Sequence, residues 1–385
     1  MVALAATLAL DCAAPPRTMP APDAGTSTGS GGGPGTGGAT NLHPLKDFLG
    51  DVAYPDDFWR PATAAEGHMD IAKLQQAVAT IDASPWEIHS FFVARNGRLV
   101  LERYGWSSGT DPNAADLTPH QTLPSERHLL YSATKSFTST LVGIAIEQGL
   151  ISGVGHLVAP WFTDYASLNP SADKSAITLE DLLTMRSGLR WAEGDATTFS
   201  APDPARAMLA RDVVDLPVGQ VWNYSSGGSD IVAELLRITT GLPPLEYGRT
   251  RLFAPLGILD PPWVAGASGT NHGGWGLSLT SREMARFGEL YRNRGTWAGT
   301  QVVPATWTDV STVARCPTAW GRHYAYHWWV SDVPGFFFAL GAFGQTIFVN
   351  RDLGLVVVFT ANLSSDIAAN VYEGLLRDYV VPAAL

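Results

Sequence analysis

Two β-hairpin patterns at opposite ends of the chain constrain its fold more than any other feature. The first, EIHSFFVARNGRLVLERYGW, has two apolar runs on either side of Asn96-Gly97, a strong signal for a type I′ turn. In the second, PGFFFALGAFGQTIFV and LGLVVVFTANL flank the turn Asn350-Arg351-Asp352. Strands from both ends of the chain are therefore expected to pair in one antiparallel sheet.

The chain between the hairpins has mainly helical patterns. Apolar residues at helical spacing and capping residues together mark helices in the middle of the chain and near both of its ends. These helices are predicted over 69–82, from Thr178 to Gly188, from Ser229-Asp230 to Gly241, from Thr280 or Ser281 to Gly295, and over 366–379.

These elements predict an α+β fold with two parts. One part is an antiparallel sheet built from the N- and C-terminal segments and flanked by helices, at about 44–111 and 312–385; the other is an inserted all-α lobe at about 112–311. Both belong to one predicted domain over 44–385. Strict alternation of strands and helices is absent, which argues against a doubly wound sheet or a TIM barrel.

The composition excludes several classes of function. Hydrophobic residues make up 45% of the 385 positions and charged residues only 16%, so the chain can bury a large core. The net charge is -11 without a basic cluster, which argues against nucleic acid and anionic membranes as partners. The two cysteines, Cys12 and Cys316, are too few for a zinc site, and the histidines include no HExxH spacing. We predict no metal and no cofactor.

The first 43 residues are predicted to be a signal-like segment and a linker. MVALAATLAL is an apolar run too short to span a bilayer, and Leu10-Asp11-Cys12 resembles a lipoprotein cleavage site, although Asp11 stands where a small residue is expected. The tract from Pro22 to Thr40 is rich in Gly, Ser, Thr and Pro and is typical of a flexible tether. We expect an exported protein, periplasmic or attached to the envelope, without a transmembrane helix in its mature domain.

Two serine motifs are interpreted as structural. Gly105-Trp-Ser107-Ser-Gly109 matches a G-x-S-x-G nucleophile elbow, but loop-forming residues follow where the elbow requires a helix. It is interpreted as a turn at the end of a strand. Ser171-Ala-Asp-Lys174 has S-x-x-K spacing within the polar run NPSADKSA, and it is interpreted as a solvated loop.

The third motif, Ser132-Ala-Thr-Lys135, opens a strongly apolar helix. Residues at i and i+3 lie on one helix face, so the Lys135 amine can reach the Ser132 hydroxyl. Burial and the positive end of the helix dipole both favour the neutral amine that a general base requires. The alternative is that Ser132 caps the helix and that Lys135 extends to the surface.

Two further segments favour the catalytic interpretation. PVGQVWNYSSGG places Tyr224 in a turn before a helix, where a tyrosine beside a lysine amine can relay a proton. The alternative for Tyr224 is an ordinary half-buried aromatic. In GAFGQTIFV, small residues interrupt an apolar strand, where the backbone can approach a ligand and donate an N–H to an oxyanion; the alternative is a β-bulge.

Five segments taken in order resemble a known superfamily. They are YSATKSFTSTLVGIAIEQGLI, ITLEDLLTMRSGL, PVGQVWNYSSGG, GGWGLSLTSREMARFGELY and FGQTIFVNRDLGLVVVFTAN. This set resembles the serine β-lactamase-like and penicillin-binding-protein-like superfamily, in the class C-like branch with family VIII carboxylesterases and aminohexanoate-oligomer hydrolases. The resemblance extends from about Tyr54 to the C-terminus.

The resemblance implies roles for particular residues. Ser132 would be the acylated nucleophile, Lys135 its base and Tyr224 the acid/base of the family's Tyr-x-Asn motif, in which Ser226 replaces the asparagine of that motif. The oxyanion hole would consist of the Ser132 N–H and a second N–H near Ala342. Gly341 and Phe343 are the neighbouring candidates for that second donor.

One departure from the family narrows the expected substrate. No lysine follows Lys174, so the family's Lys-Thr-Gly motif, whose cation helps to bind a substrate carboxylate, is absent. We therefore expect a serine hydrolase that acts on uncharged carboxylic esters or small amides, with a carboxylesterase as the leading hypothesis. An amide hydrolase of the aminohexanoate-oligomer type comes next, then a β-lactamase or DD-peptidase. An exported binding protein on an inactive hydrolase fold is the non-enzyme alternative, and the oligomeric state stays open.

Overall fold

The computed structural model describes residues 59–61, 67–110 and 118–385. The predicted signal-like segment, the linker and Cys12 lie outside these residues. Among the helices described, none combines the length and the apolar character that crossing a membrane requires.

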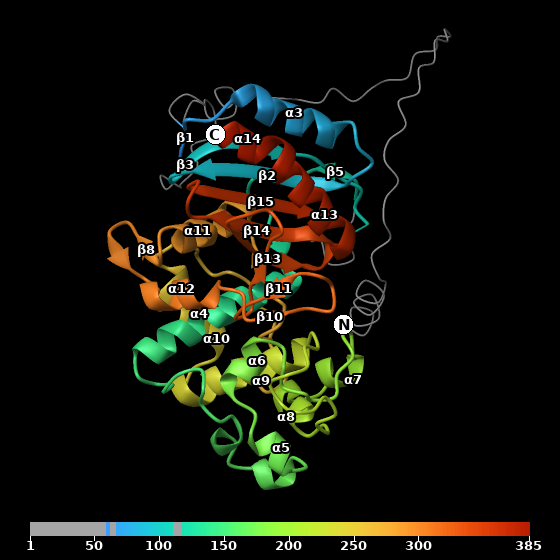
Figure 1. Ribbon diagram of the computed structural model, residues 1–385, viewed down its shortest axis with the longest axis vertical. Helices are drawn as coiled ribbons and strands as arrows, with labels where there is room; N and C mark the ends of the chain where they lie inside the picture. The colour runs from blue at the N-terminus through green and yellow to red at the C-terminus, as the bar shows by residue number, and fades with distance from the viewer. Residues whose placement is uncertain (1–58, 62–66, 111–117) are drawn as a thin grey trace.

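A nine-stranded sheet joins the two ends of the described chain (Figure 1). Its order is β1-β3-β2-β15-β14-β13-β12-β11-β10, and every pair is antiparallel except β1 with β3. The strands are β1 (Arg60–Pro61), β2 (Ile88–Arg95), β3 (Arg98–Tyr104), β10 (Cys316–Pro317), β11 (His323–Tyr324), β12 (Trp329–Val330), β13 (Phe336–Gly341), β14 (Gln345–Asn350) and β15 (Leu355–Ala361). Both ends of the chain thus contribute to one sheet, as predicted.

Three short strand pairs lie outside this sheet. They are β4 (Trp106–Ser107) with β5 (His120–Gln121), β6 (His128–Leu129) with β7 (Ser278–Leu279), and β8 (Thr296–Trp297) with β9 (Thr300–Gln301). Strand β6 of the β6–β7 pair ends three residues before Ser132, the predicted nucleophile.

Helices cover both faces of the sheet and form the inserted lobe (Figure 1). The α-helices are α3 (Ile71–Asp82), α4 (Thr134–Glu147), α5 (Ala172–Ser175), α6 (Leu179–Leu183), α7 (Ala196–Phe199), α8 (Pro204–Leu209), α9 (Ser226–Thr240), α10 (Pro244–Gly248), α11 (Ser281–Arg292), α12 (Ala305–Ser311), α13 (Ser365–Leu375) and α14 (Val381–Ala384). The 3-10 turns are η1 (Tyr131–Ala133), η2 (Ala159–Trp161), η3 (Tyr165–Ser167) and η5 (Ala342–Gly344), and the π-helical turns are η4 (Arg249–Phe253) and η6 (Leu376–Val380).

The sheet separates two hydrophobic cores. Along β15, Val356 and Val358 belong to the core shared with α11 and the helical lobe, whereas Val357 and Phe359 belong to the core under α3 and α13. This alternation follows from the period of two along a strand, with apolar neighbours on both faces. Figure 1 shows α3, α13 and α14 on one side of the sheet and α11 on the other.

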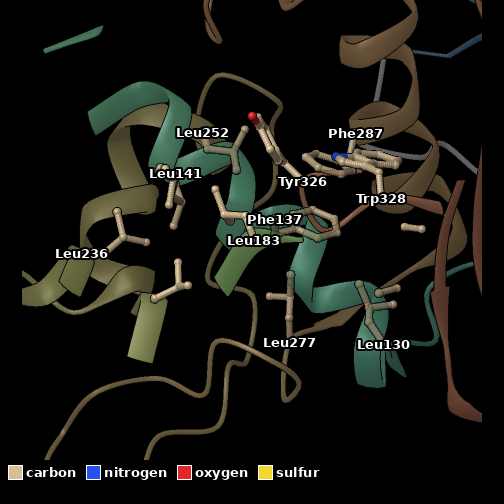
Figure 2. Close-up of a cluster of buried hydrophobic side chains, with 14 of the residues drawn as sticks. Leu130, Phe137, Leu141, Leu183, Leu236, Leu252, Leu277, Phe287, Tyr326 and Trp328 are labelled. Carbon is tan, nitrogen blue, oxygen red and sulfur yellow. The ribbon is translucent and has the colours of Figure 1, made fainter. Parts of the chain in front are cut away.

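Helix α4 runs through the centre of the core that is shared with α11 and the helical lobe. Phe137 stacks on Phe287 of α11 with ring centroids 3.7 Å apart, and Leu141 belongs to the same buried cluster. Figure 2 shows these side chains with Leu236 of α9 and Trp328 beside them. All residues of α4 from Thr134 to Ala145 are buried, so the helix that carries Lys135 is held on all sides.

Several predicted boundaries need correction. The run PGFFFALGAFGQTIFV is two antiparallel strands, β13 and β14, and residues 342–344 form the turn η5 rather than a strand interior or a bulge. Helix α9 begins at Ser226 with Ser225 as its N-cap, three residues earlier than predicted. The helix after Thr178 has the expected capping box but ends at Leu183, before Gly188.

Other predictions are confirmed. The Asn96-Gly97 turn joins β2 to β3, and both of its residues have positive φ. Helix α11 has Thr280 as its N-cap with a capping box to Glu283. The mixed architecture, a large antiparallel sheet flanked by helices together with a helical insertion, agrees with the predicted α+β fold.

Candidate active site

Ser132 and Lys135 lie together at the start of α4. Ser132 is the middle residue of the turn η1, and Lys135 is the second residue of the helix. The Lys135 Nζ lies 3.0 Å from the Ser132 Oγ, so the i, i+3 spacing brings the two groups into hydrogen-bond contact. Ser132 itself is half-buried.

The Lys135 amine is buried among polar partners. The residue is 1% exposed, and besides Ser132 its Nζ contacts the Ser226 Oγ at 2.7 Å and the Gly274 carbonyl at 2.9 Å. The first turn of α4 has no side-chain cap from Ser132. The alternative of a capping serine with a surface lysine is therefore wrong for this motif.

The partners of Lys135 are held by a second layer of hydrogen bonds. Asp230 accepts the Gly273 N–H at 2.9 Å, and the Thr138 hydroxyl donates to the Gly273 carbonyl at 2.8 Å, which positions the neighbouring Gly274 carbonyl. A Cβ on Gly273 would lie 2.0 Å from the Ser229 carbonyl, so only glycine fits between this loop and α9.

The His327 ring contacts the first turns of both α4 and α9, the two helices next to the Lys135 amine. Its Nδ1 lies 3.2 Å from the Lys135 carbonyl and its Nε2 lies 3.3 Å from the Ser229 hydroxyl. Burial lowers the pKa of His327 to about 3. The ring is therefore neutral near pH 7, and its Nδ1–H donates to the Lys135 carbonyl.

Tyr224 lies against the amine, as expected from the sequence. The Lys135 Nζ lies 4.7 Å from the centroid of the Tyr224 ring. Four more aromatic rings surround Tyr224 at centroid distances of 5.5 to 6.3 Å. They belong to Trp222, Trp320, Tyr324 and Trp329. Trp222 is half-buried and Trp320 is 36% exposed, so part of this aromatic surface faces solvent.

The end of β13 lies directly beside η1. A Cβ on Gly341 would lie 2.0 Å from the Leu130 carbonyl, so the backbones meet as closely as glycine allows. In the following turn, the Phe343 ring lies 5.0 Å from that of Tyr131, the residue before Ser132. Gly341, Ala342 and Phe343 are thus near the turn that carries Ser132, as the oxyanion prediction requires.

Sequence reasoning missed two contacts at this site. The Gly274 carbonyl accepts from Lys135, but a backbone acceptor has no side-chain signature in a sequence. The Glu193 carboxylate accepts a hydrogen bond from the Ser226 hydroxyl and another from the Ser226 N–H at 3.1 Å. Ser226, which replaces the asparagine of the family motif, has its Oγ 2.7 Å from the amine.

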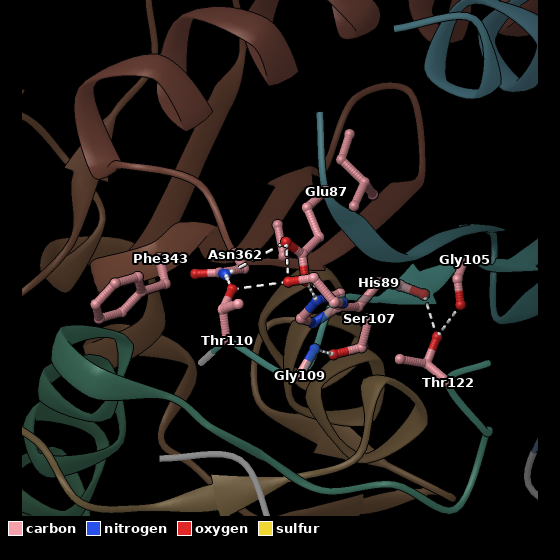
Figure 3. Close-up of polar contacts among 12 residues, drawn as sticks. Glu87, His89, Gly105, Ser107, Gly109, Thr110, Thr122, Phe343 and Asn362 are labelled. Atoms are coloured by element: carbon pink, nitrogen blue, oxygen red, sulfur yellow. Dashed lines mark hydrogen bonds and ion pairs between the residues drawn. The ribbon is translucent and has the colours of Figure 1, made fainter. Parts of the chain in front are cut away.

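The G-x-S-x-G motif forms a structural turn in the described residues. Ser107 is 2% exposed, ends β4 and accepts the Gly109 N–H at 3.2 Å. Figure 3 shows the polar network around it, in which Glu87 accepts from the Ser108 N–H and hydroxyl at 2.8 Å each and from His89 at 3.0 Å. The hydroxyl of Ser107 thus completes a turn, and residues 111–117, which follow the motif, lie outside the described part.

The interpretation of Lys174 as solvated is wrong. The residue is 1% exposed, and its Nζ donates to the carbonyls of Leu168 at 2.9 Å and Asn169 at 2.5 Å. The Ser171 hydroxyl accepts from the Lys174 backbone N–H rather than from its amine. This second S-x-x-K therefore closes a loop and caps the short helix α5.

The arrangement can support one type of chemistry. A serine hydroxyl, a buried amine, a tyrosine ring and a strand end with closely approaching backbone lie within one small region, which is the set of groups that acyl transfer through a serine requires. Within the described residues, no group of three or more His, Cys, Asp or Glu side chains is arranged to hold a metal ion.

Known proteins that are similar to this chain share its fold. The Beta-lactamase family profile matches residues 89–380. The 6-aminohexanoate-dimer hydrolase of Paenarthrobacter ureafaciens is 23% identical over 77% of this chain and 79% of its own length. A family VIII carboxylesterase structure superposes with a TM-score of 0.65 at 18% identity over 82% of this chain and 97% of that one. A penicillin-binding protein homologue from Caulobacter crescentus superposes with a TM-score of 0.66 at 15% identity over 82% of this chain and 97% of that one.

Proposed function

The chain belongs to the β-lactamase family, and from this premise we propose that it is a serine hydrolase that cleaves uncharged carboxylic esters through an acyl-enzyme. Relatives with this fold include hydrolases of amide oligomers and of esters. The observation that carries the proposal is the 3.0 Å contact between the Ser132 hydroxyl and the Lys135 amine, which is buried and lies over the Tyr224 ring.

Acylation follows from the order of these groups. Lys135 takes the proton of the Ser132 hydroxyl as Oγ bonds to the substrate carbonyl carbon, and the carbonyl electron pair moves to its oxygen. The N–H of Ser132 and one N–H from Gly341, Ala342 or Phe343 stabilise this oxyanion. The bond to the leaving alcohol then breaks, Tyr224 donates its proton to the alcohol oxygen, and Lys135 returns a proton to Tyr224.

Deacylation repeats these steps with water. Tyr224 and Lys135 remove a proton from a water molecule as its oxygen bonds to the acyl carbon. The ester bond to Ser132 then breaks, the carboxylic acid leaves, and the Ser132 hydroxyl recovers its proton. No cofactor enters either half of the cycle.

The surroundings of the site support an uncharged, apolar substrate. Strand β13, beside the nucleophile, carries no lysine or arginine. The carboxylate of Glu193 lies behind Ser226 and repels an anionic substrate. The partly exposed rings of Trp222 and Trp320 offer an apolar surface next to Tyr224, suited to an alkyl or aryl ester group.

Hydrolysis of short amide oligomers is the second candidate. It is favoured by the similarity to the 6-aminohexanoate-dimer hydrolase, because the same acyl-transfer groups can cleave an amide. Steady-state rates on aminohexanoate dimer beside p-nitrophenyl butyrate separate the two candidates. We expect the ester to have the higher kcat/KM, and a higher value for the dimer would reverse the order.

The nucleophile is tested by substitution and by labelling. Ser132→Ala, Lys135→Ala and Tyr224→Phe should each nearly abolish hydrolysis of p-nitrophenyl butyrate, and a fluorophosphonate probe should label Ser132. Ser107→Ala and Ser171→Ala are matched controls, because each removes the serine of a competing motif and should leave activity near the wild-type level. Full activity of Ser132→Ala would refute the proposal, and failure of the probe to label Ser132 would favour a binding protein.

A further inference from the structure

Glu193 contacts the base through a single intervening residue. It lies in the loop before α7 and is half-buried. One carboxylate oxygen accepts from the Ser226 hydroxyl, and the other accepts from the Ser226 N–H at 3.1 Å and from the Trp191 indole at 2.7 Å. Ser226 Oγ in turn lies 2.7 Å from the Lys135 Nζ.

The direction of each hydrogen bond follows from which atoms carry protons. A carboxylate can only accept, so the proton of the Ser226 hydroxyl points to Glu193. Ser226 Oγ must then accept from the Lys135 amine. The Gly274 carbonyl, at 2.9 Å, can also only accept from the amine. These two contacts thus take N–H groups of Lys135.

The Ser132 hydroxyl lies within reach of the lone pair. A neutral amine has two N–H groups and one lone pair, and when both N–H groups are directed at Ser226 and Gly274, the lone pair is available to the Ser132 hydroxyl, 3.0 Å from Nζ. If Glu193 did not hold the proton of Ser226, that hydroxyl could turn and donate to the same lone pair. The base would then face a competing hydroxyl 2.7 Å away.

We propose that Glu193 is a positioning residue for the base: acting through Ser226, it directs the Lys135 lone pair at Ser132 and stabilises the ammonium ion that forms when Lys135 takes the serine proton. The inference rests on the proposed function. Glu193 neither gains nor loses a proton in the cycle; its negative charge offsets the positive charge on Nζ, as the third group of a catalytic triad does for its base.

Other titratable groups around the amine come from three further segments. The Tyr224 ring faces it at 4.7 Å, and His327 contacts the Lys135 carbonyl. Asp230, paired with His272 at 3.3 Å, holds Gly273 next to the Gly274 carbonyl. The pKa of His327 is lowered to about 3, so its ring stays neutral across the pH range of an activity assay.

A purely structural role for Glu193 makes a different prediction. Its contacts with the Ser226 N–H and the Trp191 indole would stabilise the start of α9 whatever the state of Lys135. Losing them would lower the melting temperature and leave the pH dependence of catalysis unchanged. The pH profile therefore separates the two roles.

The test is a pH–rate profile of Glu193→Gln on p-nitrophenyl butyrate. We expect kcat to fall roughly 10- to 100-fold, less than loss of a general base itself, with KM within about twofold. The acidic limb of kcat/KM should move to lower pH by roughly one unit, because the ammonium form of Lys135 loses its counter-charge. An unchanged kcat and acidic midpoint would overturn the inference.

A second variant keeps the test decisive if Glu193→Gln does not fold. Ser226→Ala breaks the link to the amine while the contacts of Glu193 with the backbone N–H and Trp191 persist. It should show a similar fall in kcat with a smaller shift of the acidic limb, because the charge of Glu193 remains. The double variant should lose little more than either single one, because both act on one path. If the two substitutions lowered kcat independently, so that their effects multiplied in the double variant, the proposed path from Glu193 through Ser226 to Lys135 would be contradicted.

The matched control is Asp195→Asn, in the same loop. Asp195 caps α7 and pairs with Arg211 at 2.5 Å, and the described contacts do not link it to Lys135. Its loss should lower stability and leave the acidic midpoint in place; a shift as large as that of Glu193→Gln would count against the inference. Fluorophosphonate labelling of wild-type Ser132 separates the two levels: labelling with an unchanged Glu193→Gln profile refutes this inference alone, whereas absence of labelling refutes the proposed function.

Discussion

Replacing His327 with asparagine should make the stability of this protein less sensitive to acid. His327 is 2% exposed, and burial lowers its pKa from 6.5 to about 3. In the unfolded chain the same ring titrates near its ordinary value. Between these two pKa values the unfolded state binds the proton and the folded state does not.

The sign and size of the effect follow from this difference. Stability rises with pH wherever the unfolded state binds more protons, so the contribution of His327 is fully present above about pH 7 and is lost as the pH falls towards about 3. At pH 5 the loss is about 2 kcal/mol, and it approaches about 5 kcal/mol below pH 3. The His327→Asn variant lacks this term at every pH.

The assay is urea unfolding of both proteins at pH 7.5, 6.5 and 5.0. Asparagine places an amide N–H near the position of Nδ1, which lies 3.2 Å from the Lys135 carbonyl, but it does not titrate. The wild type should lose about 2 kcal/mol more than the variant between pH 7.5 and pH 5. Carboxylate titrations are common to both proteins and cancel in the difference.

The outcome that refutes this reasoning is a constant gap. If the difference in unfolding free energy between wild type and His327→Asn is the same at pH 7.5 and at pH 5, the buried ring is not held neutral. His128 allows the test to be repeated elsewhere in the molecule. It is buried, and burial together with the charges of His89 and His120 lowers its pKa to about 3 as well.

Two further predictions concern backbone packing and the second buried lysine. Gly341→Ala should abolish most ester hydrolysis and lower the free energy of unfolding by about 1–3 kcal/mol, because its Cβ would lie 2.0 Å from the Leu130 carbonyl. Gly155→Ala, which has open space around it, is the control in activity and melting assays. Lys174→Met should lower the free energy of unfolding by about 1–3 kcal/mol for each carbonyl left unsatisfied, and it should leave kcat/KM unchanged. Urea unfolding and ester kinetics measure these two effects. A large fall in kcat/KM would contradict the structural role of Lys174.

The sequence predicted the strands whose ends are marked by a turn or by a change in alternation. It missed a strand boundary that has no such mark. Asn96-Gly97 is a turn with an unmistakable composition, and it separates β2 from β3 as expected. The turn between β13 and β14 has Phe343 at φ 59°, a conformation that a bulky side chain rarely adopts. Both flanking strands are buried on both faces, so no change in periodicity marks their boundary.

The candidate site was predictable where contacts are local. Ser132 and Lys135 are three residues apart on one helix, so their contact follows from helix geometry. The contact between Glu193 and Ser226 spans 33 residues and depends on how a loop folds back over the start of α9. Neither residue type, taken alone in a loop, indicates such a pairing.

The two S-x-x-K motifs show that burial alone does not make a lysine a base. Lys135 and Lys174 are each 1% exposed, and burial lowers the pKa of Lys174. The amine of Lys174 faces two carbonyls, which can only accept and therefore favour a protonated donor. The amine of Lys135 faces one carbonyl, that of Gly274, and two hydroxyls: the proton of Ser226 points to Glu193, and the proton of Ser132 is the one that Lys135 takes in the proposed mechanism. The proposed function therefore assigns the role of base to Lys135 and not to Lys174, because only Lys135 has a neighbour, Ser132, with a proton to give.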